Sequence, residues 1–152
     1  MFKQSSHLLL SVLLISLVMP ACSVFVKNNA KNGFKKQKVV YHLNDVNSAH
    51  GVLRNIKNHL NALGQDNVEI VAVAHSSGAY ALVMGTQDRK GRPFDVAIRS
   101  LARRGVTFQL CANTVRNKKI PKTSIDPNAK LVPSGVAQLI NLQQHGYLYI
   151  KP

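Results

Sequence analysis

The chain has 152 residues, 45% of them hydrophobic, and carries a formal charge of +14 from 20 lysine and arginine residues against six acidic ones. It is long enough for one domain with a single buried core, and nothing in it indicates a second. A basic chain can bind nucleic acid, but its few aromatic residues are not interleaved with the basic ones as a base-stacking surface requires. We therefore expect no nucleic-acid partner.

The first 23 residues have the pattern of an export signal. Lys3 precedes an apolar run, Leu8 to Met19, that is too short to span a bilayer comfortably, and small residues follow it. The stretch LVMPAC resembles a bacterial lipoprotein box with Cys22 as the lipidated residue, while ordinary cleavage after Ala21 or Ser23 is the alternative. We expect export to a bacterial periplasm and leave lipidation of Cys22 open.

Residues 24–37 are expected to form a basic flexible tether ahead of a folded domain at residues 38–152. The tether is rich in asparagine and lysine, which disfavours a packed structure. Behind a lipid anchor it would lie against anionic headgroups, each basic residue contributing about 1 kcal/mol near the surface. Contact with a membrane surface is therefore one expected interaction, and an ordinary solvated basic surface is the alternative.

The first half of the domain alternates strands and helices. A β-branched run at residues 38–44 predicts a strand, and residues 45–64 predict a helix. Its apolar side carries four residues at helical spacing: Leu53, Ile56, Leu60 and Leu63. Residues 68–75 are almost continuously apolar, as expected for a strand covered on both faces, and residues 78–85 predict a short helix.

The second half continues the alternation. After a polar loop, Pro93 is expected to open a helix that stops at Gly105, and residues 106–111 predict a third strand. Residues 116–129 contain two prolines and several charges, which predicts an irregular connection. A fourth strand, a helix and a fifth strand are expected at residues 130–133, 134–146 and 147–150. One side of this last helix carries Val136, Leu139, Ile140 and Gln143.

Strands separated by helical lengths imply right-handed crossovers and a parallel sheet with helices on both faces. The predicted fold is of the α/β class, a three-layer α/β/α sandwich with a five-stranded, mainly parallel sheet. In such sheets ligands bind beyond the carboxyl ends of the strands. The first three predicted strands end in His42, His75 and Cys111, so we expect a functional site there.

Cys111 is the candidate reactive group. Its thiol could be ionised by a helix N-terminus, by Arg116 or by a protonated His75, and the thiolate would be a nucleophile that prefers sulfur. The alternative is a buried structural cysteine, because cysteine is among the residue types most often buried. Cys22 is not expected to pair with it, being lipidated, removed or left on a flexible terminus.

Three other chemistries are weighed against this one. Two imidazoles and a thiolate are a credible set for copper or zinc, but their spacing matches no compact ligand motif, so we assign no metal. Ser76 stands two residues before Gly78, as in a serine-hydrolase elbow, yet only His145 follows it, on an exposed helix end. Ser76, Ser77 and Gly78 are instead expected to cap a helix whose N–H groups face a small anion or sulfur ligand. No nucleotide-binding glycine loop is present, so no cofactor is expected.

Several stretches carry a resemblance to a known family, among them KVVYHLND, VEIVAVAHSSG, LARRGVTFQLCANT and VPSGVAQLINLQQHGYLYIKP. Together they resemble the exported single-domain branch of the DsrE/DsrF-like family, over nearly all of residues 38–152. The resemblance implies a DsrEFH-like, flavodoxin-like topology and a homo-oligomer, either trimer or hexamer. Sulfur-relay members accept sulfane sulfur as a persulfide on a cysteine after the third strand, and Cys111 matches that position.

The resemblance makes a sulfurtransferase-like sulfur carrier the first expectation, with a sulfur donor and acceptor as partners. His42, His75 and Asn113 recur in this branch, and we expect them to bind ligand together with Ser76 and Gly78. A non-enzymatic module that binds a small ligand or assembles into oligomers is the alternative, with Cys111 structural. Metal binding through His42, His75 and Cys111 is a less favoured third.

Overall fold

In the computed structural model, which describes residues 33–152, one sheet of five parallel strands forms the centre of the molecule. The strands are β1 Gln37–Leu43, β2 Val68–Ala74, β3 Thr107–Cys111, β4 Ala129–Val132 and β5 Leu148–Ile150. All five coincide closely with the predicted strands. The predicted signal segment, Cys22 and most of the tether lie outside the described residues.

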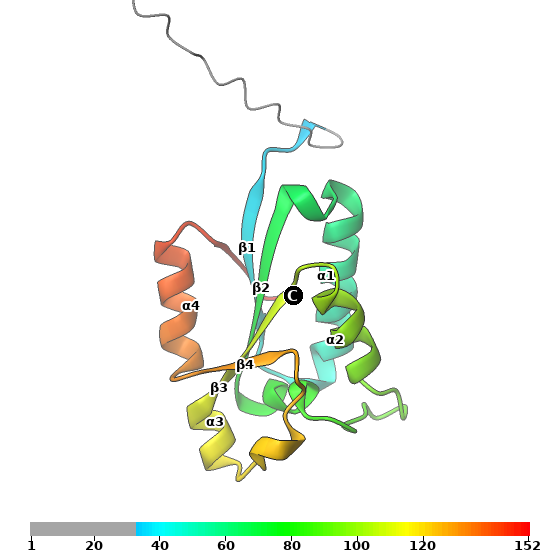
Figure 1. Cartoon of the computed structure of the whole chain (residues 1–152), viewed down its shortest axis with the longest axis vertical. Helices are drawn as coiled ribbons and strands as arrows, with labels where there is room; N and C mark the ends of the chain where they lie inside the picture. Colours follow the sequence, from blue (N-terminus) through cyan, green and yellow to red (C-terminus); the bar gives the residue numbers. More distant parts are fainter. Residues whose placement is uncertain (1–32) are drawn as a thin grey trace, which may run out of the picture.

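Helices cover both faces of the sheet, which confirms the three-layer α/β/α sandwich (Figure 1). Helices α1 Ala49–Leu63 and α2 Asp95–Ala102 lie on one face, and α4 Gly135–Gln144 lies on the other. The short helix α3 Ala112–Asn117 continues directly from β3. Single 3-10 turns occur at Val46–Ser48, Gln65–Asn67 and Lys122–Ser124, and a longer 3-10 segment at Ser76–Leu82. Within residues 33–152, no helix is both long and apolar enough to cross a membrane.

The strand order is β4-β3-β2-β1-β5. The chain moves in one direction from β1 to β4 and then crosses back to place β5 on the other side of β1. The direction of winding therefore reverses between β1 and β5, and such a switch point is where open α/β sheets form a ligand crevice. Flavodoxin has the same layers and parallel sheet with a different order, 2-1-3-4-5.

The larger hydrophobic core lies between the sheet and the α1 and α2 layer. Phe94, Phe108 and Ile56 are fully buried there, and each such side chain contributes about 1.5–3 kcal/mol relative to exposure. The four apolar residues predicted for the inner side of α1 are all buried: Leu53, Ile56, Leu60 and Leu63. Gly64 ends α1 with a φ of 83°, a left-handed conformation that favours glycine.

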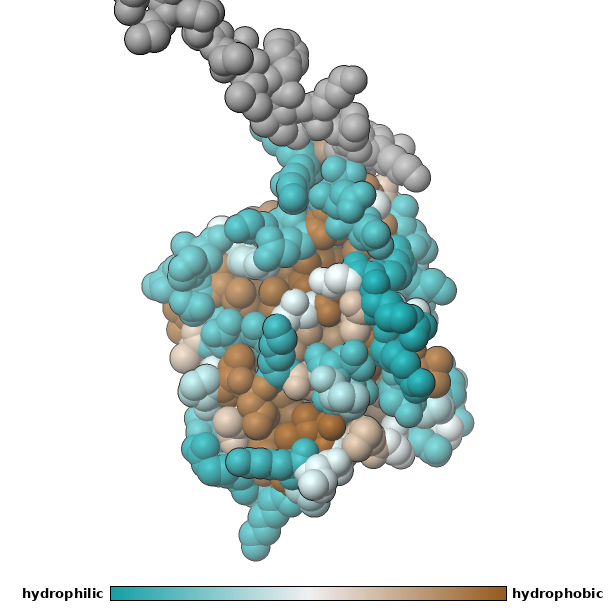
Figure 2. Space-filling model, viewed as in Figure 1, coloured by the Kyte–Doolittle hydropathy of each residue, from teal (hydrophilic) through white to brown (hydrophobic). Residues whose placement is uncertain are grey.

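The opposite face has a smaller core, because α4 alone covers it. Val40, Val71 and Val73 pack there against Leu139 and Leu142. The structure corrects the predicted apolar side of this helix, since Val136 is 59% exposed and Ile140 is 52% exposed. Apolar surface is accordingly exposed beside α4 and around edge strand β4 (Figure 2).

Three local predictions also differ from the structure. Residues 76–82 form a 3-10 segment where a short α-helix was expected at residues 78–85. Helix α2 begins at Asp95, because Pro93 forms an isolated bridge with Gln87 before the chain turns into the helix. Helix α3 begins immediately after β3, and Val115 from its second half is buried in the larger core.

Candidate functional site

Three strand ends bring His42, His75 and Cys111 to one region on the α4 side of the sheet. Successive side chains of a strand point to opposite faces. Their neighbours Leu43, Ala74 and Leu110 belong to the core under α1 and α2, so the three site residues face the other way. Strand β2 pairs with both β1 and β3, which places His75 between the other two.

A chain of hydrogen bonds runs through the two histidines. The Nε2 atoms of His42 and His75 lie 2.6 Å apart. On the outer side, His42 Nδ1 lies 2.6 Å from the hydroxyl of Tyr149, a residue of β5. His75 Nδ1 lies 2.9 Å from the hydroxyl of Ser76. Four side chains from three strand ends thus form one continuous polar path across the switch point between β1 and β5.

Both imidazoles are neutral at neutral pH. Burial, the neighbouring His75 and the charge of Lys151 together lower the pKa of His42 to about 4. Burial and Lys151 also lower the pKa of His75. A neutral imidazole has one N–H group and one free nitrogen. The path can therefore be oriented either from Tyr149 toward Ser76 or from Ser76 toward Tyr149, and a proton entering one end can leave at the other.

Cys111 is the free cysteine of the described residues, and its side chain is 6% exposed. Burial alone would raise the pKa of the thiol. Hydrogen bonds from the Thr114 hydroxyl, and from the backbone N–H groups of Gly135, Thr114 and Asn113, outweigh that effect and hold the pKa below its ordinary value. The site therefore stabilises the thiolate, the nucleophilic form.

Of the three predicted sources of this stabilisation, the structure supports a helix N-terminus, because the N–H groups belong to the first turns of α3 and α4, and it corrects the other two. His75 is not a protonated neighbour, because its pKa is lowered. The guanidinium of Arg116 donates to the side-chain oxygen of Asn113, so that pair is satisfied on the surface of α3. Among residues 33–152, the groups that lower the pKa of Cys111 are neutral donors of the chain itself. Asn113 contributes through its backbone N–H, whereas its side chain binds Arg116.

Gly135 is the first residue of α4, and it lets the start of this helix lie close to both Cys111 and His75. A Cβ atom built at Gly135 would lie 3.1 Å from the Cβ atoms of both Cys111 and His75. Glycine at this position lets the first turn of α4 approach the two side chains and places its N–H on the sulfur. Ser134 begins that turn by accepting a hydrogen bond from Ala137.

Ser76 belongs to the candidate site, whereas Ser77 and Gly78 make hydrogen bonds outside it. Ser76 has a φ of 52°, a left-handed conformation that non-glycine residues rarely adopt, and its N–H donates to Thr114 Oγ1 at 3.3 Å. Backbone strain of this kind gathers at functional sites. Ser77 binds Asp45 instead. The N–H of Gly78 donates to the carbonyl of Asn44, so it does not face a ligand as expected.

Metal binding lacks a complete ligand set in the described part of the chain. His42 and His75 meet, but residues 33–152 contain no group of three or more histidine, cysteine, aspartate or glutamate residues that could hold a metal ion. Cys111 therefore does not join the two imidazoles as the third ligand that the copper or zinc hypothesis required.

Sequence reasoning missed four residues of the site: Thr114, Gly135, Tyr149 and Lys151. Thr114 and Gly135 follow the third and fourth strands, where loops line the carboxyl edge of the sheet. Tyr149 and Lys151 belong to the closing YIKP of the sequence, within one of the stretches that carried the family resemblance. Their position beside His42 depends on the pairing of β5 with β1, which strand patterns alone do not reveal.

Comparisons with known proteins agree with this architecture. The sequence model of the DsrE/DsrF-like family matches residues 23–152. No curated protein matches the chain. Among solved structures, the chain is similar to MTH1491 from Methanobacterium thermoautotrophicum, a protein of unknown function, with 25% identity and a TM-score of 0.68 over 76% of this chain and 99% of that one. It also shares the fold of the ychN protein from E. coli, with 14% identity and a TM-score of 0.61 over 78% of this chain and all of that one. The family match spans the whole sheet and both helical layers, and on this basis the chain belongs to the DsrE/DsrF-like family.

Proposed function

We propose that the protein handles sulfur by carrying it as a persulfide on Cys111. The observation that carries this proposal is the set of donors around the sulfur, one hydroxyl and three backbone N–H groups, which favour a thiolate at the mouth of the sheet. Thiolates attack sulfur readily, and the DsrE/DsrF-like family is associated with sulfur relay. The substrate class is therefore a sulfane sulfur donor such as thiosulfate or a polysulfide.

The transfer needs no external oxidant or reductant. The Cys111 thiolate attacks the outer sulfur of the donor, forming a new S–S bond while the donor's own S–S bond breaks. With thiosulfate, the leaving group is sulfite and the product is the Cys111 perthiolate, so the total charge is unchanged. A second thiolate on an acceptor reverses the step by attacking the outer sulfur of the persulfide, which restores the Cys111 thiolate.

The surrounding groups have distinct parts in this proposal. The N–H groups of Gly135, Thr114 and Asn113 stabilise negative charge on the sulfur before and after transfer, as preorganised donors do for other anions. An acceptor that arrives as a thiol must lose its proton before it attacks, and the path from Ser76 through His75 and His42 to Tyr149 takes up that proton. Tyr149 is 42% exposed and can exchange that proton with water.

The test is the intact mass of the purified protein after incubation with polysulfide. We expect a gain of about 32 Da, the mass of one sulfur atom, which a thiol reductant removes. Cys111→Ser should abolish the gain, whereas Cys22→Ser, the matched control, should retain it. Absence of the adduct from the wild-type protein, or its persistence in Cys111→Ser, would refute the persulfide.

The second candidate function is a non-enzymatic module that binds a small ligand or assembles with its partners. The 6% exposure of Cys111 favours this alternative, because a structural cysteine is normally buried. A small alkylating reagent distinguishes the two. Rapid labelling of Cys111 in the folded protein supports the sulfur carrier, and labelling that requires unfolding supports the structural role.

We also propose that the protein is exported to a periplasm and associates into a homo-oligomer. Export rests on the signal pattern of the first 23 residues, and an anchor at Cys22 would place the basic tether against the membrane surface. Fractionation of cells followed by mass analysis of the mature N-terminus tests the export and the anchor.

Self-association is supported by the exposed apolar surface of α4, where Val136 and Ile140 are uncovered.

A further inference from the structure

Helices α1 and α2 lie on the face of the sheet opposite α4 (Figure 1), and a groove runs between them on the other side of the sheet from Cys111. Its volume is about 880 Å³, within the range of pockets that hold small organic molecules. We call it the α1/α2 groove. It is lined by residues of both helices, of the turn before each one and of the segment after α2, together with the last residue of the chain: Asn47, Ser48, His50, Gly51, Val52, Leu53, Arg54, Asn55, Lys57, Arg92, Pro93, Val96, Ala97, Ser100, Leu101, Arg104 and Pro152.

The floor of the groove is apolar. Leu53 of α1 and Leu101 of α2 are almost fully buried beneath it and belong to the larger core. Val96 stands on its α2 side and is 62% exposed. An exposed valine beside a leucine floor offers apolar surface to a ligand, and the described part of the chain leaves that surface uncovered.

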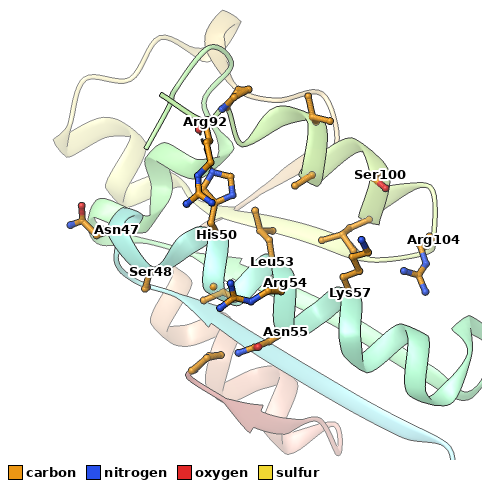
Figure 3. A pocket seen from close by; sticks show the side chains of 17 residues that line it. Asn47, Ser48, His50, Leu53, Arg54, Asn55, Lys57, Arg92, Ser100 and Arg104 are labelled. Atoms are coloured by element: carbon orange, nitrogen blue, oxygen red, sulfur yellow. Dashed lines mark hydrogen bonds between the residues drawn. The ribbon is translucent and has the colours of Figure 1, made fainter. Parts of the chain in front are cut away.

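The rim of the groove is positively charged. In Figure 3, Arg54 and Lys57 extend from α1, while Arg92 and Arg104 lie near the two ends of α2. Arg92 is neutralised by Asp88, with its Nε atom 2.8 Å from the carboxylate. Within residues 33–152, Arg54, Lys57 and Arg104 form no ion pair, and no aspartate or glutamate lines the groove.

Three cations without an ion pair, next to an exposed apolar side chain, indicate the kind of ligand that fits. An inorganic anion would satisfy the charges and leave the floor unused, and a neutral apolar molecule would do the reverse. A nucleic acid would find no phenylalanine, tyrosine or tryptophan among the lining residues on which to stack its bases. We infer that the α1/α2 groove binds a small amphiphilic anion, with an acidic head group held by the arginine and lysine side chains and an aliphatic body packed against the exposed side chain of Val96.

This inference is independent of the proposed sulfur chemistry, because the groove and Cys111 lie on different faces of the sheet. The same ligand chemistry has two sources, a free amphiphilic acid or an anionic lipid in a bilayer. The sources are separated by comparing soluble decanoate, below its micellar concentration, with vesicles of phosphatidylglycerol. Binding to the vesicles without binding to decanoate would overturn the small-ligand inference.

The experiment is titration calorimetry of the purified protein with decanoate, with decanol and acetate as probes that lack the charge and the chain. We expect saturable binding of decanoate that is at least about tenfold tighter than that of either control probe. The double variant Arg54→Gln/Lys57→Gln should weaken decanoate binding at least about fivefold. Arg104→Gln should weaken it as well.

The matched control is Arg103→Gln, which removes the same charge next to Arg104 but outside the groove. Its affinity for decanoate should equal that of the wild-type protein. Equal weakening by Arg103→Gln and Arg104→Gln would show a response to net charge alone and would overturn the inference, as would failure of decanoate to bind. Amide shifts in an NMR titration should fall on α1 and α2, and persulfide formation on Cys111 should be unaffected by the groove variants.

Discussion

The Nε2 atoms of His42 and His75 lie 2.6 Å apart, so the protonation of each imidazole depends on the other. Two protonated rings would bring two N–H groups face to face. This contact adds to burial in lowering the pKa of His42 to about 4. The pair is therefore neutral at physiological pH, as the proposed relay requires, and protonation in acid would interrupt that relay.

Stability should fall as the pH drops from about 6.5 to 5. A histidine whose pKa is lower in the folded state than in the unfolded state takes up its proton mainly on unfolding. The free energy of unfolding therefore decreases as the pH falls below the ordinary pKa of histidine. For His42 the loss over this interval is about 2 kcal/mol. His75 and His59 also have lowered pKa values and act in the same direction.

Urea denaturation at pH 7 and pH 5 measures this dependence above the range in which the carboxylates titrate. In the variant His42→Gln, the difference in the free energy of unfolding between pH 7 and pH 5 should be about 2 kcal/mol smaller than in the wild-type protein. An unchanged difference in His42→Gln would contradict the assigned pKa.

The thiol of Cys111 should ionise below the ordinary pKa of cysteine and depend on Thr114 for part of that shift. The rate of alkylation by iodoacetamide, followed against pH, reports the midpoint of ionisation. Thr114→Val removes the hydroxyl donor and should raise that midpoint. The control variant Thr107→Val makes the same change at the opposite end of β3 and should leave the midpoint of ionisation unchanged.

The variant Tyr149→Phe tests whether sulfur transfer depends on the proton path separately from the nucleophilicity of the Cys111 thiolate. The variant removes the hydroxyl that contacts His42 and leaves the donors around Cys111 intact. The rate of sulfur transfer to an acceptor thiol should fall at least about tenfold, while the alkylation rate stays the same. If both rates fell together, Tyr149 would support the fold of the site and not the relay.

Gly135→Ala should damage the site and the fold. The added methyl group would lie 3.1 Å from the Cβ atoms of Cys111 and His75, which is tighter than ordinary packing allows. We expect a loss of about 1–3 kcal/mol in the free energy of unfolding and slower alkylation of the thiol. Gly51→Ala is the control, because a Cβ atom there meets nothing within 4 Å and should stabilise α1 by about 0.5–1 kcal/mol.

Val136→Glu should shift the protein toward the monomer if α4 is the surface of self-association. The side chain is 59% exposed, so the charge is not expected to disturb the core of one subunit. Sedimentation velocity measures the assembly state. Met84→Glu places the same charge on another exposed apolar residue and should leave the assembly intact. If Val136→Glu and Met84→Glu both kept the assembly state of the wild-type protein, α4 would be excluded as the interface.

The fold could be predicted from the sequence because its strands and long helices have strong periodic patterns. The buried side of α1 followed from the spacing of Leu53, Ile56 and Leu60. Helix α3 could not be predicted in this way, because it has six residues and its start has no side-chain cap. The inner side of α4 was also wrong, since Val136 and Ile140 fit a helical stripe equally well but face outward.

The sequence predicted that His42, His75 and Cys111 would lie close together and that a helix N-terminus could act on the thiol, but it did not identify the individual donors. His42, His75 and Cys111 stand at strand ends, and the topology of a parallel sheet brings strand ends together. Gly135 could not be identified from the sequence, because its N–H reaches Cys111 only through the packing of α4 against the end of β3. Tyr149 required knowledge that β5 pairs with β1.

The contact between His42 and Tyr149 joins residues 107 positions apart in the chain. Closing so long a loop is entropically costly, and sheets dominated by distant pairings fold slowly. The proposed proton path therefore depends on the pairing of β5 with β1. If Cys111 carries sulfur as proposed, a chain whose last strand is displaced would keep the thiol but lose the hydroxyl end of the relay, so the state of the C-terminal strand would control the transfer step.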